Sequence, residues 1–158
     1  MEREELKAEI YRLRSCYGKE RFVRDQTRFD IWYDLMGGLK ALAIHEAVTR
    51  HMATSDYPPL PASIIRLYNE VIEEWRLIMN HVWNTYNLTC DIYQRYGGEV
   101  REEDKEIFKD YLRGTPYPDR ERKAADFLHE LQAYLETKDK NADDNGLPTF
   151  REYIGGKR

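Results

Sequence analysis

Apolar residues recur every three or four positions along most of the chain, which predicts amphipathic helices rather than strands. Glycine pairs and proline clusters interrupt this pattern and indicate where helices end. The longest uninterrupted pattern follows a proline-rich break at residues 55–61, because proline suits the first turn of a helix. The helices predicted in this way cover residues 2–16, 25–36, 39–53, 61–86, 89–96, 101–113 and 119–136.

The end of the chain combines a polar stretch at residues 137–146 with a final apolar segment. We expect a loop followed by a short helix, which either packs on the core of the protein or anchors a partner. Its candidate anchors are Leu147, Phe150, Tyr153 and Ile154. The whole pattern predicts an all-α fold: a small multi-helix bundle with a long fourth helix and a short C-terminal helix after a polar loop.

Three parts of the chain follow from these breaks. Residues 1–60 are expected to form a helical N-terminal module. Residues 61–136 continue the helical region and are expected to form one compact unit with that module. Residues 137–158 make up the polar loop and the C-terminal anchor segment.

Composition indicates a globular protein, with 41% hydrophobic and 34% charged residues among 158. The net charge of −4 is uneven, since residues 1–66 hold 11 basic and 10 acidic side chains while the remainder holds 14 and 19. A general nucleic-acid coat would require a basic excess, so this class is disfavoured. A local basic patch in the first half remains compatible with these numbers.

The densest basic stretch lies between residues 12 and 28, and Tyr11, Tyr17 and Phe22 are interleaved with it. Bases stack on aromatic rings while guanidinium groups hold phosphate, so one interpretation is contact with DNA. A solvated helix face is the other interpretation and is favoured. The candidate DNA contacts are Arg12, Arg14, Lys19, Arg21, Arg24 and Arg28.

Motifs for catalysis or cofactor binding are absent from the sequence. A zincin motif starting at His45 would need a second histidine where Thr49 stands, and His51 is six residues from His45, on the other side of a helix. The phosphate-binding sequence of nucleotide hydrolases is also missing. We therefore predict no catalytic residue, no metal site and no cofactor. The lack of a long apolar run predicts no membrane contact, and we expect a soluble cytoplasmic protein.

Residues 5–65 resemble the phage replicative-helicase loader/inhibitor family. The segments that carry the resemblance are RFVRDQTRFDIWYDLMGGL, ALAIHEAVTRHMATSDY and PPLPASI, and the structural motif residues are Trp32, Tyr33, Leu35, Pro58 and Pro59. We expect Trp32 and Leu35 to insert between the first and third helices, and the two prolines to fix the turn into the fourth.

The resemblance implies a non-enzymatic adaptor that binds a hexameric replicative DNA helicase, holds it inactive or loads it at a phage origin, and meets an origin-binding initiator. It also implies that the C-terminal segment engages the helicase, with DNA contact weak or indirect. Two alternatives stay open: a DNA-binding replication or regulatory module, and a phage inhibitor of another host enzyme. Apolar residues on more than one face of the long helix also leave a homo-oligomer open.

Overall fold

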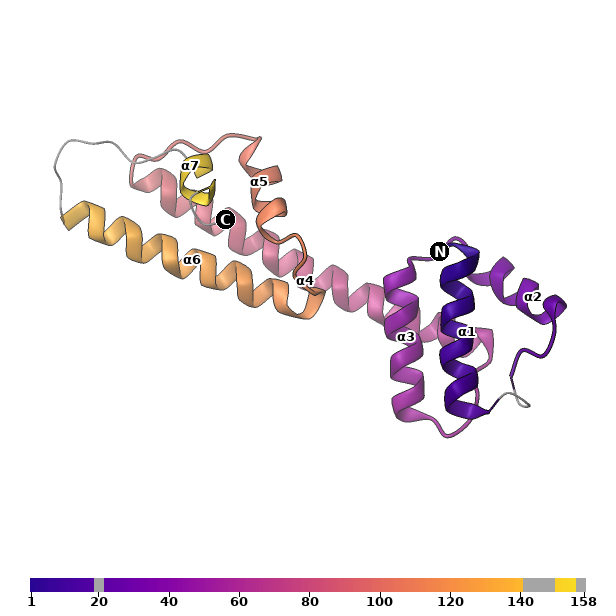
Figure 1. Cartoon of the computed structure of the whole chain (residues 1–158). Helices are drawn as coiled ribbons and strands as arrows, with labels where there is room; N and C mark the ends of the chain where they lie inside the picture. The colour runs from indigo at the N-terminus through magenta and orange to yellow at the C-terminus, as the bar shows by residue number, and fades with distance from the viewer. Residues whose placement is uncertain (19–21, 141–149, 156–158) are drawn as a thin grey trace. The chain divides into compact units, whose positions relative to one another are not determined.

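The computed structural model describes residues 1–18, 22–140 and 150–155, with the backbone alone for residues 138–140, 150, 154 and 155. The described residues form seven helices and no strand, which confirms the predicted all-α fold (Figure 1). The contacts divide the chain into two compact units, Met1–Glu74 and Trp75–Arg158, hereafter the N-terminal and C-terminal units. This division falls within the long helix, whereas the sequence suggested boundaries at residues 60 and 136, which stay a prediction.

The N-terminal unit consists of α1 (Arg3–Tyr17), α2 (Gln26–Met36), α3 (Ala41–Thr54) and the first part of α4 (Pro61–Arg95). Asp25 caps α2, because its side chain accepts a hydrogen bond of 2.9 Å from the backbone N–H of Arg28. A reciprocal pair, Glu2 and Glu5, caps α1. The core of this unit is formed by Leu6, Ile10, Leu13, Phe22, Val23, Phe29, Trp32, Met36, Ile44, Ala47, Val48 and Ile64.

Two apolar side chains of α2 and α3 are exposed instead of buried. Leu35 and Leu42 expose 51% and 62% of their surface, so the expected insertion of Leu35 between the first and third helices was wrong. The buried positions of α2 are Phe29, Trp32 and Met36, and Leu35 stands about 100° around the helix from Met36. More apolar positions are present on α2 and α3 than one buried stripe can accommodate.

Helix α4 continues for 35 residues through Arg95, so the separate helix predicted at residues 89–96 was wrong. The segment after Tyr86 contains weak helix formers but no proline or glycine. Tyr86 and Tyr93 are seven residues apart, which places both on one face, and both are buried. Thr89 satisfies its buried hydroxyl within the helix, by donating to the Thr85 carbonyl at 2.7 Å. Packing therefore overrides the local preference.

The C-terminal unit consists of the remainder of α4, α5 (Asp104–Tyr111), α6 (Tyr117–Lys140) and α7 (Phe150–Gly155). Helix α6 extends at both ends beyond the predicted 119–136 and enters the stretch expected to be a loop. The ring of Trp75 stacks on Tyr117 with centroids 4.2 Å apart, which ties the start of α6 to α4. The core is rich in aromatic residues and comprises Val82, Tyr86, Tyr93, Phe108, Leu112, Ala124, Phe127, Leu131 and Leu135.

The turn after α4 requires glycine at position 98. A Cβ at Gly98 would lie 2.3 Å from the ring of the fully buried Tyr93. Because Tyr93 cannot move without disturbing the core, Gly98→Ala is expected to lower the free energy of unfolding by about 1–3 kcal/mol.

Urea denaturation followed by circular dichroism measures this loss. Gly38→Ala is the control, since no described atom lies within 4 Å of the added carbon, and it should change stability by less than about 0.5 kcal/mol. Equal stability of the two variants would show that the Tyr93 ring yields.

Candidate interaction surfaces

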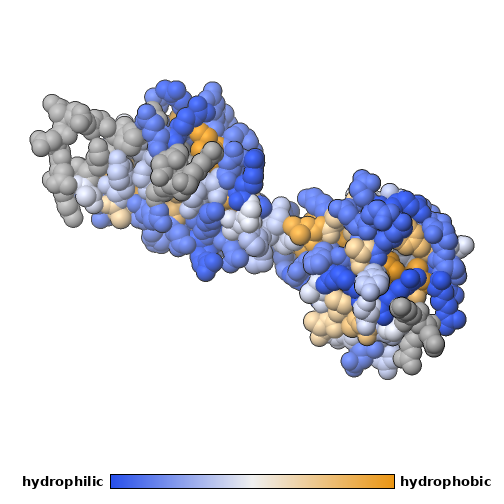
Figure 2. All heavy atoms as spheres, in the orientation of Figure 1, coloured by the Kyte–Doolittle hydropathy of each residue, from blue (hydrophilic) through white to orange (hydrophobic). Residues whose placement is uncertain are grey.

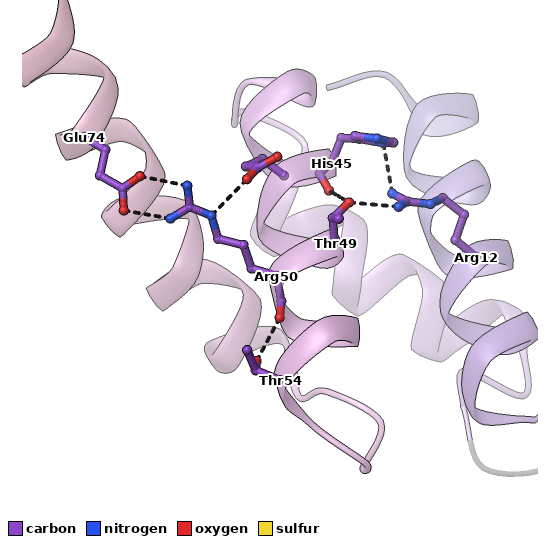
Figure 3. Close-up of polar contacts among 7 residues, drawn as sticks. Arg12, His45, Thr49, Arg50, Thr54 and Glu74 are labelled. Atoms are coloured by element: carbon purple, nitrogen blue, oxygen red, sulfur yellow. Dashed lines mark hydrogen bonds and ion pairs between the residues drawn. The ribbon is translucent and has the colours of Figure 1, made fainter. Parts of the chain in front are cut away.

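A polar network joins α1 to α3 in the N-terminal unit (Figure 3). The carboxylate of Glu9 is buried, and it accepts a hydrogen bond of 2.6 Å from Arg12 and lies 2.8 Å from Nδ1 of His45. Arg12 also donates to the Thr49 hydroxyl at 2.8 Å. A buried carboxylate is costly unless it is paired, so this network holds two helices together rather than presenting free charges.

A second network joins α3 to α4 within the same unit. Arg50 donates to both carboxylate oxygens of Glu74 at 2.7 Å and from Nε to Glu46 at 3.0 Å (Figure 3). The hydrogen bond from Arg50 lowers the pKa of Glu74, and the hydrogen bond to Glu74 raises the pKa of Arg50. Both side chains are partly exposed, which keeps the contribution of this pair near or below about 1 kcal/mol.

The predicted basic stretch does not form a row of unpaired cations where the structure describes it. Arg12 belongs to the network with Glu9, Arg14 donates to the Val23 carbonyl, and Nε of Arg28 lies 4.0 Å from Asp25. Arg24 is exposed and has interactions of its own. Lys19 and Arg21 lie outside the described residues. Contact with DNA by this stretch therefore stays a prediction.

Histidines and cysteines are spread through the described residues without forming a metal centre. No group of three potential ligands is found among the residues that the structure covers. His51 is engaged with the Tyr57 carbonyl at 3.0 Å. Cys16 is exposed and Cys90 is half-buried, and burial raises the pKa of the Cys90 thiol.

None of the described helices combines the length and hydropathy needed to cross a bilayer.

The loop between α3 and α4 presents the two most exposed large hydrophobic side chains among the described residues. Tyr57 exposes 75% of its surface and Leu60 exposes 70%, while Pro59 between them is buried. Apolar side chains also interrupt the hydrophilic surface of this unit on the face shown in Figure 2. The sequence indicated a turn at Pro58 and Pro59 but not the exposure of Tyr57 and Leu60.

This loop is held in place from both sides. The Tyr17 hydroxyl donates to the Ser55 carbonyl at 2.9 Å, and Ser55 and His51 both interact with the Tyr57 carbonyl. Prolines fix φ and restrict the residues that precede them to extended conformations. The backbone at Tyr57 and Leu60 therefore has little conformational entropy left to lose, which favours binding to another protein.

In the C-terminal unit, α7 packs on rings of α6. The ring of Tyr153 lies 5.1 Å from that of Tyr134 and 5.8 Å from that of Phe127, centroid to centroid. Arg151 forms an exposed ion pair of 3.6 Å with Glu103, just before α5. Of the other predicted anchors, Phe150 and Ile154 belong to α7, where the structure describes their backbone alone. Leu147 lies outside the described residues.

Residues 1–65 match the family model for the N-terminal domain of the phage SPP1 helicase loader. The match covers the N-terminal region alone. The resemblance predicted for the N-terminal region is thus confirmed. No curated protein and no solved structure matches the chain.

The loader domain match covers α1, α2, α3, the proline loop and the start of α4. Within it, the motif residue Trp32 is buried and packs edge-on against Phe22 at 5.1 Å. Tyr33 lies under the guanidinium of Arg3 at 4.7 Å. Trp32 belongs to the core of the N-terminal unit, and Tyr33 packs against that core. Residues 66–158, with the rest of α4 and the whole C-terminal unit, lie outside the match.

Substitution of Arg12 in the network around Glu9 can distinguish an arginine that stabilises the fold from one that contacts DNA. Arg12→Ala would leave the buried Glu9 carboxylate with His45 alone, so the free energy of unfolding should fall by about 1–3 kcal/mol. Arg28→Ala is the matched control, because its side chain is exposed and its ion pair is long, and it should change stability by less than about 0.5 kcal/mol.

Thermal unfolding measures the stability of both variants, and fluorescence anisotropy with a labelled duplex measures DNA affinity. Unchanged stability together with an equal loss of DNA affinity in both variants would favour direct DNA contact instead.

Proposed function

We propose that this protein is a non-enzymatic adaptor that binds a hexameric replicative DNA helicase in the cytoplasm of a phage-infected cell and holds it inactive or loads it at an origin. The observation that carries the proposal is the match of residues 1–65 to the loader domain family. The engagement of Arg12 and Arg14 within the fold supports a protein rather than DNA as the main partner.

An adaptor between a helicase and an initiator needs two separate binding surfaces. The chain folds as two compact units, and each has its own hydrophobic core. We assign helicase contact to the C-terminal segment, with Leu147, Phe150, Tyr153 and Ile154 as anchors, because the family resemblance implies it. The exposed pair Tyr57 and Leu60 on the loader domain is the second surface, and we assign it to the initiator.

The helicase assignment predicts a loss of binding from two C-terminal substitutions. The double variant Phe150→Ala/Ile154→Ala should weaken binding to the helicase hexamer about tenfold or more, since a few apolar anchors dominate most interfaces. Biolayer interferometry with immobilised hexamer and ATP measures the affinity. Leu88→Ala is the control, because Leu88 is an exposed apolar residue on α4 of the same unit.

Unchanged affinity of the double variant would remove the C-terminal segment from the helicase contact. Failure of the unaltered chain to bind any helicase hexamer of its host at tens of micromolar would remove the adaptor function itself.

The initiator assignment predicts that Tyr57→Ala/Leu60→Ala leaves the protein folded, because both side chains are largely in water. The affinity for an origin-binding initiator should fall about tenfold, while the affinity for the helicase stays unchanged. The same interferometry with each partner measures both values. A parallel loss for both partners, or no loss for either, would contradict the assignment of this loop.

A further inference from the structure

The six residues of α7 are too few to form a stable helix in water without packing partners. In the C-terminal unit α7 contacts α5, and its described side-chain partners include the rings of Phe127 and Tyr134 and the carboxylate of Glu103. We name these three side chains the α7-binding surface. Tyr153 is half-buried on this surface. Its ring cannot lie on Tyr134 and fill a pocket of another protein at the same time.

We propose that α7 is self-docked in the free protein and must leave the α7-binding surface to engage the helicase, so that its intramolecular docking competes with partner binding. This inference rests on the proposed function and adds a regulatory step to it. The occupant of the surface in the free protein is α7 itself.

Two observations make the docked helix releasable. Arg151 and Glu103 are 64% and 74% exposed, so their ion pair contributes little. The ring of Tyr153, which packs on Phe127 and Tyr134, is half-buried rather than enclosed. A six-residue helix with an exposed ion pair and a half-buried ring is expected to detach more easily than the unit unfolds.

The unit retains its core when α7 leaves. Phe127, on which Tyr153 packs, is fully buried and also contacts the ring of Tyr111 at 5.2 Å and that of Phe108 at 5.5 Å. Most of the core therefore lies among α4, α5 and α6 and does not depend on α7. Detachment uncovers a limited aromatic surface instead of opening the unit.

Competition of this kind lowers the apparent affinity for the helicase in proportion to the fraction of molecules in which α7 is free. Substitutions that weaken the α7-binding surface, without altering α7, should therefore strengthen helicase binding. A purely structural role of α7 would give no gain.

The test measures helicase affinity for three full-length variants. Glu103→Arg places a like charge opposite Arg151, and Tyr134→Ala removes one ring from the surface, so each should tighten binding about 3- to 10-fold. Glu102→Arg is the matched control, because it makes the same charge change one residue away from the ion pair, and it should leave affinity unchanged. Circular dichroism confirms that each variant is folded.

The outcomes separate this inference from the proposed function. If the unaltered chain binds and neither Glu103→Arg nor Tyr134→Ala binds more tightly, the competition is wrong and the adaptor function stands. A gain of equal size for Glu102→Arg would also overturn it, since net charge alone would then explain the effect. If neither the unaltered chain nor any variant binds, the proposed function fails and the competition fails with it. If Glu103→Arg and Tyr134→Ala bind the helicase and the unaltered chain does not, the result supports both the competition and the adaptor function.

Discussion

The structure depends on one helix, α4, that supplies apolar side chains to two separate cores. Ile64 belongs to the core of the N-terminal unit, whereas Val82, Tyr86 and Tyr93 belong to that of the C-terminal unit. Because each unit closes a core of its own, each can keep its outer surface for other molecules. An adaptor requires this property, since it must bind two partners without one surface blocking the other.

Polar side chains in the N-terminal unit mostly stabilise its helix packing. Glu9, Arg12 and His45 connect α1 to α3, and Arg50 connects α3 to Glu74 of α4. Charged side chains that are paired within the protein in this way are poorly suited to holding phosphate. This pairing weakens the case for a DNA-binding module. The exposed side chains of Tyr57 and Leu60 offer apolar surface instead, which fits a protein partner.

Much of the fold could be predicted from local sequence, because helical periodicity and caps are short-range signals. The Asp25 cap and the long helix after Pro61 are examples. Prediction failed where long-range packing decides the result. The helix continues past Tyr86 because Tyr93 is buried by residues far away in sequence, and Leu35 is exposed because Trp32 and Met36 already fill the core side of α2.

The candidate surfaces were harder to predict for the same reason. The motif around Trp32 could be recognised because it lies within one continuous stretch of sequence, but the packing of Tyr153 on Tyr134 depends on contacts that no local pattern encodes. The central proposal is that the protein acts by binding a replicative helicase. Native mass spectrometry of the chain with the host's replicative helicase and an ATP analogue tests it most directly. The account predicts hexamer masses increased by whole multiples of 18.9 kDa. Helicase and chain appearing only as separate species across the concentration range would contradict it.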